Sequence, residues 1–450
     1  MTVEGRETVR KAIRLFFGPV GAIGLAELIG ISFLFTYHAE WEGGALRRFL
    51  LMDDAMISMS YARSLVEGCG LVWYCGAERV EGITNLGWTL YMALWQALEI
   101  APEYAAFPIL LTGLLTLGLH LWGIYLLGVR FFSVTVGRLA VWAMALLPTV
   151  WVWHSAGLET GALATLLVRI GLELERTVPR PFVLGLLSGL GTFLRMDFFI
   201  WALGAATGKA LSARSCRPLF PVVLGGIGLG VGILLFRKSY YGDWWPNTYC
   251  LKVTDIPSLH RWVNGILSTC FHIIYNLPLW ILAIGGLWRR RAFLFGGPIL
   301  GVSLLYNIYV GGDIEEMPFS SNRFLFMSST SLVVLAGSIV DRGGVICRLM
   351  GVLLIGHGVP LYPFEWGARW RALLGPVGAY IWKGRWAEEN RYPILGVRPF
   401  PVERYLSPGQ KVAVGFGGTY PFFTDNIAGS IFLENQMQKS ARQGTCSTVG

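Results

Sequence analysis

The stretch Leu51–Trp88 decides how this chain is interpreted, and it reads LMDDAMISMSYARSLVEGCGLVWYCGAERVEGITNLGW. Two adjacent carboxylates, Asp53 and Asp54, come shortly after the first long apolar segment, and a helix-like run with Tyr61 and Arg63 follows them. The polar side chains of the hairpin expected after this run are Arg79, Glu81, Thr84 and Asn85. The rest of the chain is strongly apolar, so a dense polar segment beside the first apolar segment indicates a functional site.

The composition of the whole chain predicts a membrane protein. Of 450 residues, 54% are hydrophobic and only 14% are charged, whereas soluble domains carry about 25% charged residues. Eighteen Trp and 17 Tyr suit two aromatic belts at the membrane surfaces. The net charge of +9 needs no nucleic acid to explain it, because cytoplasmic loops of membrane proteins are rich in Lys and Arg.

The hydropathy pattern predicts an α-helical polytopic protein with about eleven transmembrane helices. A span needs roughly 20 apolar residues, and the spans are expected near 13–37, 104–128, 137–153, 160–175, 181–194, 198–210, 219–236, 271–288, 293–310, 324–340 and 345–361. Four basic residues precede the first span, and every second loop after it is basic. This alternation predicts a cytoplasmic N-terminus and an outer C-terminal tail.

One segment, residues 85–98, is apolar enough to cross the membrane but would reverse the later loops if it did. We expect a short helix lying at the outer surface, and a twelfth span remains the alternative. The predicted domains are a transmembrane domain over 1–361, whose first outer loop is 38–103, and a small α+β extracytoplasmic region over 362–450.

With this orientation the polar clusters all face outward. They are Asp53–Glu81, His154–Glu159, Arg195–Asp197, Tyr240–Lys252 and Gly311–Arg323. A transporter would instead place polar groups near the middle of the membrane, on broken helices of repeated halves. Polar groups gathered at one face favour an enzyme that works at the membrane surface.

Each cluster also has a purely structural interpretation. Arg195 and Asp197 could form an ion pair that closes a tight turn, and His154 could be a solvated residue of a short loop. The aromatic residues of Tyr240–Lys252 would suit a membrane belt. Asp54 is expected to cap a helix that begins near Ala55.

Taken together and in order, the clusters resemble one family. The segment DDAMISMSYARSLVEGCGLVW…ERVEGITNLGW is similar to the first outer loop of bacterial GT-C glycosyltransferases, in particular the terminal β-arabinofuranosyltransferases of cell-wall arabinan. The later motifs that agree are GLET at 157–160, RMD at 195–197, YYGDWWPNTY at 240–249, GGD at 311–313 and NRFL at 322–325. The resemblance covers about residues 10–330, and the sugar and the acceptor stay open.

The resemblance implies sugar transfer from a polyprenyl-phosphate donor to a cell-envelope glycan or glycoconjugate, at the outer face of the bacterial inner membrane. It places the catalytic base on Asp53 or Asp54, and Asp53 is favoured because Asp54 is the expected cap. The cations available for the donor phosphate are Arg63, Arg195, Lys252 and Arg323. The side chains expected to contact substrate are Tyr61, Glu81, Thr84, Asn85, His154, Glu159, Asp197, Asp243, Trp244, Asn247 and Asp313.

No cofactor beyond the lipid-linked donor is expected. No His/Cys set has zinc spacing, although Asp53, Asp54 and Glu159 could hold a divalent ion through oxygen ligands. Cys69 and Cys75 could form a disulfide in an oxidising compartment, or they could be two free thiols. The competing functions are a transporter or flippase of lipid-linked sugar and a non-catalytic scaffold of envelope assembly.

Overall fold

The computed structural model describes residues 18–42, 44–249, 253, 257–312 and 322–342, and the account below is confined to them. The expected span at 345–361, the C-terminal region 362–450, Lys252 and Asp313 lie outside the described residues.

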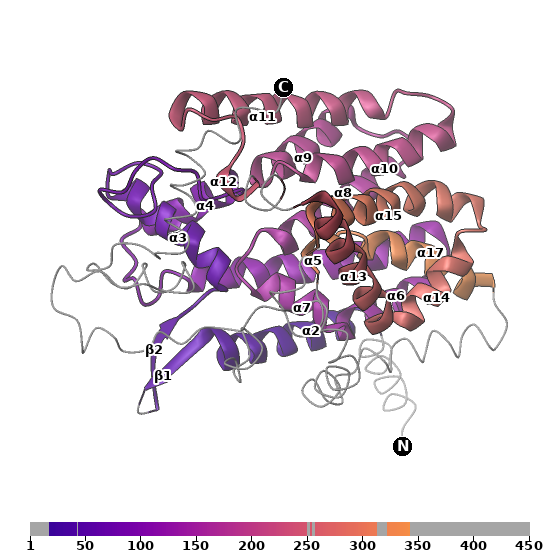
Figure 1. The fold of residues 1–450 in the computed structure, drawn as a ribbon. Helices are drawn as coiled ribbons and strands as arrows, with labels where there is room; N and C mark the ends of the chain where they lie inside the picture. The colour runs from indigo at the N-terminus through magenta and orange to yellow at the C-terminus, as the bar shows by residue number, and fades with distance from the viewer. Residues whose placement is uncertain (1–17, 43, 250–252, 254–256, 313–321, 343–450) are drawn as a thin grey trace, which may run out of the picture.

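The described chain is mostly helical (Figure 1). Its first part contains α2 (Pro19–Phe33), a π-helical turn (Leu34–His38), the strands β1 (Ala39–Glu42) and β2 (Ala45–Phe49), α3 (Asp53–Val66) and α4 (Leu86–Gln96). The middle part contains α5 (Phe107–Phe131), α6 (Val134–Leu146), α7 (Pro148–Ser155), α8 (Thr160–Leu174), α9 (Pro181–Leu194) and α10 (Phe198–Ala213). The last part contains α11 (Leu219–Tyr240), α12 (Asn247–Tyr249), α13 (Ser258–Tyr275), α14 (Leu277–Gly286), α15 (Arg290–Val310), α16 (Arg323–Phe326) and α17 (Ser329–Arg342).

Four of these helical segments are long and apolar enough to cross a membrane, namely Pro19–His38, Phe107–Phe131, Leu219–Tyr240 and Arg290–Val310. Two bent pairs, α6 with α7 and α13 with α14, would raise the number to six. The expected span at 137–153 is interrupted because Pro148 opens α7, and the two helices meet at 63°. The described fold is therefore consistent with a membrane protein, while the expected count of about eleven spans stays a prediction.

The segment expected to lie at the outer surface forms a short helix. Helix α4 has 11 residues and is therefore about 16 Å long, roughly half of what a membrane span needs. Its position relative to a membrane stays a prediction.

Prolines and glycines determine where several helices begin and how closely they pack. Pro181 opens α9 and Pro148 opens α7, because proline is tolerated in the first helical turn. Helices α9 and α11 pack against one another at glycine, where a Cβ added to Gly225 would lie 2.0 Å from the carbonyl oxygen of Gly185. Only glycine therefore permits this approach of the two backbones.

Figure 1 shows α3, α4 and the strand pair together at one end of the molecule, with α14 and α17 at the other. Strands β1 and β2 form an antiparallel pair just before the acidic segment, and the sequence interpretation did not anticipate it. The polar hairpin expected after α3 is wrong in its details, because residues 67–85 contain turns and bends but no strand.

Candidate active site

Helix α3 carries the acidic pair in its first turn. It begins at Asp53, the residue before it is Met52, and no side chain caps it. The expectation that Asp54 caps a helix beginning near Ala55 is therefore wrong. The Met52 amide donates to the carbonyl of Ala156 at 3.0 Å, which ties the start of α3 to the GLET turn.

Asp54 forms an ion pair with a residue 269 positions away along the chain. Its Oδ2 lies 3.2 Å from Nη1 of Arg323, the first residue of α16. The Asn322 side chain caps α16 by accepting from the amides of Phe324 and Leu325. The described structure thus places the NRFL motif beside the acidic pair.

Arg195 joins two other motifs. Its Nη1 lies 2.8 Å from Oε1 of Glu159, and its Nε lies 2.9 Å from Oδ1 of Asp197. The ion pair within the RMD motif is therefore confirmed. Burial opposes the charge on Arg195, but Asp197 and Glu159 more than offset burial, so the pKa of the guanidinium lies above its usual value.

Glu159 connects this pair back to the first loop. It is 1% exposed, and its Oε2 accepts from Nδ2 of Asn85 at 2.8 Å. Asn85 Oδ1 in turn accepts from the Ser58 hydroxyl of α3 at 3.0 Å. Asn85 immediately precedes α4, Glu159 precedes α8 and Asp197 precedes α10.

We call Asp54, Arg323, Arg195, Glu159 and Asp197 the charged network. Four motifs distant in sequence supply it, namely the acidic pair, GLET, RMD and NRFL.

The sequence interpretation missed two aromatic residues that contact this network. The Tyr306 hydroxyl on α15 donates to Asp197 Oδ2 at 2.8 Å. The guanidinium carbons of Arg195 and Arg323 lie 5.5 and 5.3 Å from the ring centre of Phe324, and Tyr306 meets the same ring edge-on. Both cations therefore contact the Phe324 ring.

The GLET turn is shaped by Gly157, whose φ is +84°. This conformation favours glycine, and a Cβ added there would lie 2.7 Å from Leu51. The Gly157 carbonyl accepts from the indole Nε1 of Trp88 at 2.9 Å. The turn thus fixes Glu159 against both α3 and α4.

Tyr61 and Glu81 stabilise the first loop through hydrogen bonds and an ion pair. Glu81 and Arg237 are 5% and 2% exposed and form an ion pair at 2.8 Å. Burial raises the pKa of Glu81 to about 7, although Arg237 opposes the rise. The Tyr61 hydroxyl donates to Val80 O at 2.7 Å and accepts from the Gly82 amide at 2.9 Å. Both side chains therefore hold the loop in place, which the sequence did not indicate.

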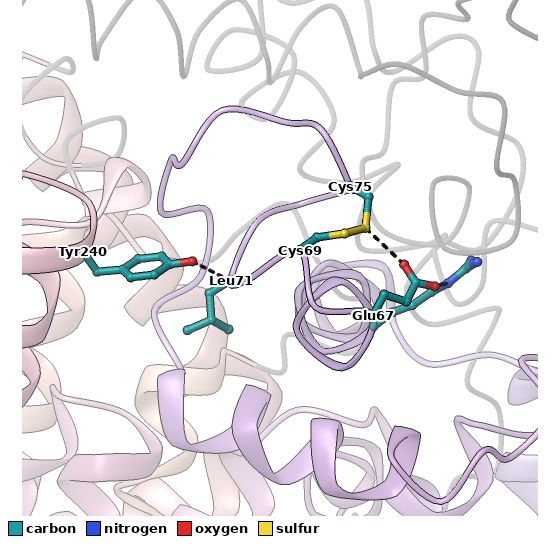
Figure 2. The surroundings of a disulfide bond; sticks show 6 residues. Glu67, Cys69, Leu71, Cys75 and Tyr240 are labelled. Carbon is teal, nitrogen blue, oxygen red and sulfur yellow. Dashed lines mark hydrogen bonds and ion pairs between the residues drawn. A yellow bond between two sulfur atoms is a disulfide. The ribbon is translucent and has the colours of Figure 1, made fainter.

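A disulfide between Cys69 and Cys75 closes the outer part of this loop. Figure 2 shows Tyr240 reaching the enclosed residues, where its hydroxyl accepts from the Leu71 amide at 2.9 Å. The Tyr241 hydroxyl donates to the Leu71 carbonyl at 3.0 Å. The loop therefore rests against the end of α11.

Among the described residues, Glu67, Cys69 and Cys75 are also the one group of three or more His, Cys, Asp and Glu side chains within ligand distance of one another. Both cysteines are already bonded to each other. The divalent ion considered for Asp53, Asp54 and Glu159 stays a prediction.

The remaining candidates fall in different places. Arg63 contacts Glu67 at 2.7 Å and, ten residues along α3 from Asp53, lies about 15 Å from the start of the helix. Asp243 and Trp244 are exposed, Thr84 is partly buried and Asn247 is buried.

His154, which is expected to contact substrate, does not lie on an exposed loop, the alternative considered for it. It is a residue of α7, 1% exposed, and its Nε2 lies 2.9 Å from Nδ1 of His120. Its Nδ1 lies 3.0 Å from the Thr116 hydroxyl. The interpretation as a solvated loop residue is therefore wrong.

Comparison with known proteins gives one informative match. The chain is 28% identical over 279 residues to the terminal β-(1→2)-arabinofuranosyltransferase of Mycobacterium tuberculosis. This match supports a distant relationship to the arabinosyltransferases. It covers 56% of this chain and 43% of the mycobacterial enzyme, so the chain spans less than half the length of that relative. No protein-family model matches, and no solved structure matches.

Proposed function

We propose that this protein is a membrane glycosyltransferase that moves a sugar from a polyprenyl-phosphate donor to a cell-envelope glycan or glycoconjugate. The observation that carries the proposal is the charged network, in which Asp54 meets Arg323 and Glu159 meets Arg195. The similarity to an arabinofuranosyltransferase supports the reaction class and suggests arabinofuranose as the sugar.

In the proposed reaction, an acceptor hydroxyl oxygen bonds to the anomeric carbon of the donor sugar. The bond from that carbon to the phosphate oxygen breaks, and its electron pair stays on the departing lipid phosphate. The hydroxyl proton passes to a carboxylate, a step that is typically worth about 100- to 10,000-fold in rate. The resemblance places the base in the acidic pair, and we propose that Asp53 is the base. Asp54 lies 3.2 Å from Arg323, and we propose that it positions this arginine.

The arginines of the network have the chemistry that the departing phosphate needs. Guanidinium groups bind phosphate oxygens through charge-assisted hydrogen bonds. Arg195 and Arg323 share the Phe324 ring as a support, so both can approach one phosphate. We propose that they stabilise the charge that develops on the leaving group.

We further propose that the protein lies in the bacterial inner membrane with this site facing outward. The Cys69–Cys75 disulfide supports this orientation, because disulfides persist in oxidising compartments. The test is labelling of cysteines placed at Ser212 and Ser258. Labelling of Ser258→Cys from outside and of Ser212→Cys only from the cytoplasm is expected, and the reverse pattern would contradict the orientation.

The function is tested with purified protein and a panel of polyprenyl-phosphate sugars, with oligosaccharide acceptors. The expected result is transfer from one donor and at least 100-fold slower transfer by Asp53→Asn, with donor binding retained. Movement of lipid-linked sugar across proteoliposomes without any transfer would contradict the proposal and support a transporter.

A further inference from the structure

Exposed aromatic rings occur in the segment after α11 and near the end of α15. Trp244, Trp245 and Tyr309 are 46%, 43% and 40% exposed. Together with Tyr249 they form what we call the aromatic shelf.

Three rings of the shelf, those of Trp245, Tyr249 and Tyr309, are joined by contacts. Trp245 stacks on Tyr249 with the ring centres 5.2 Å apart and the planes 27° apart. The hydroxyls of Tyr249 and Tyr309 are 2.5 Å apart. The segment after α11 is thus joined to α15, and these contacts fix the positions of the three rings.

The shelf is continuous with the charged network through α15. Tyr309 lies three residues beyond Tyr306, so the two side chains share one side of the helix and differ by about 4.5 Å along its axis. Tyr306 donates to Asp197 of the network. A chain molecule lying along the shelf would therefore reach the network at its inner end.

The chemistry of the shelf fits a sugar chain. A sugar ring has an apolar C–H face and a polar edge of hydroxyls, and an aromatic ring with a negative face and a polar tip complements both. Cations accompany the rings, since Lys238 lies 5.9 Å from the Trp244 ring centre and Arg261 lies 5.2 Å from that of Tyr309. Exposed Asp243 adds a hydrogen-bond acceptor at the edge.

We infer that the aromatic shelf binds the acceptor glycan, with its sugar rings stacked on the shelf and its terminal hydroxyl directed to the charged network. This inference rests on the proposed function and names the part of the site that selects the acceptor. The competing occupant is the headgroup region of the membrane, where Trp and Tyr also gather.

The test is direct binding of a fluorescently labelled arabinofuranosyl trisaccharide to the purified full-length protein, measured by anisotropy. Trp245→Ala is expected to weaken binding about five- to tenfold, as expected for the loss of one stacked ring. Trp245→Phe should restore most of it because a ring returns. The matched control is Trp288→Ala, which removes an 88% exposed tryptophan outside the shelf and should leave binding unchanged.

Equal trisaccharide affinity of the wild type and Trp245→Ala would overturn the inference. So would failure of the wild type to bind arabinofuranosyl and glucosyl trisaccharides at millimolar concentration. A loss of thermal stability in lipid nanodiscs with unchanged trisaccharide binding would assign the shelf to the membrane surface instead.

Donor cleavage, measured without acceptor, separates this inference from the proposed function. Trp245→Ala should cleave donor as the wild type does while raising the KM for acceptor. If the wild type transfers sugar from no donor of the panel, the proposed function fails, yet the anisotropy measurement still decides whether the shelf binds glycan.

Discussion

Replacing Arg195 tests the centre of the charged network. The guanidinium holds Glu159 at 2.8 Å and Asp197 at 2.9 Å. Arg195→Gln leaves Glu159, which is 1% exposed, without its cation and without water to replace it. Breaking a buried ion pair by removing one partner costs about 3–5 kcal/mol. Asp197 keeps its hydrogen bond from Tyr306, so we expect a loss near the lower figure, about 3 kcal/mol.

The double variant Arg195→Gln/Glu159→Gln separates stability from function. Removing both charges should recover about 2 kcal/mol of the loss, within the usual range of coupling between residues in contact. Donor binding should not recover, because no guanidinium remains to meet the phosphate. Arg195→Lys should lie between the wild type and Arg195→Gln in both stability and donor binding, because a point-charge ammonium does not reproduce the planar fork of the guanidinium.

The assay is denaturant-induced unfolding in detergent micelles, paired with binding of a polyprenyl-phosphate sugar. A cost below about 1 kcal/mol for Arg195→Gln, with additive effects in the double variant, would refute the argument that the pair is buried and coupled. Normal donor binding by a destabilised Arg195→Gln would show that the ion pair is structural only.

Three further predictions concern the acidic pair and the loop that follows α3. Asp53→Asn should slow transfer at least 100-fold with little loss of stability. Asp54→Asn should cost more stability, because Asp54 loses its ion pair with Arg323. Denaturation curves and transfer rates measured on both variants test this, and the opposite pattern would exchange the roles of the two residues. The pKa of Glu81 is about 7 in the folded protein, against an ordinary 4.5, so the folded state binds more protons than the unfolded state between these pH values. The free energy of unfolding should therefore fall by up to about 3 kcal/mol from pH 4.5 to 7 and then level off. Glu81→Gln should flatten this dependence in pH-resolved unfolding, and an unchanged slope would exclude Glu81 as its source. Cys69→Ser should leave a free thiol at Cys75 that external maleimide labels, and labelling of the unreduced wild type at these positions would show that the disulfide does not form in cells.

The helical character of the chain could be predicted, because apolar composition and the prolines that open helices are local features. The break between α6 and α7 could also have been predicted, since Pro148 stands inside the expected span. The strand pair β1–β2 carried a signal as well, because Gly43 and Gly44 separate two short runs with polar and apolar residues interspersed.

The candidate site was predicted in its motifs but not in its contacts. The acidic pair, Glu159 and Arg195 were all named from the sequence, yet nothing local shows that Asn85 links the first loop to Glu159. The capping prediction for Asp54 failed because Met52 is held by Ala156, and the helix starts two residues earlier than expected. Tyr306 was missed because a single tyrosine in an apolar helix resembles a packing residue, although a hydroxyl there needs a partner.

The direction of the helices around the network has an electrostatic consequence. The side chains of the network comprise two arginines and three carboxylates, which leaves one net negative charge. Helices α3, α4, α8 and α10 all begin at this network or at Asn85 beside it. Each helix start contributes about half a positive charge from its unpaired amides. Together the four helix starts supply about two positive charges, which offset the negative charge of the network and that of Asp53 in the first turn of α3. The protein supplies this field with backbone that need not reorient when charge moves.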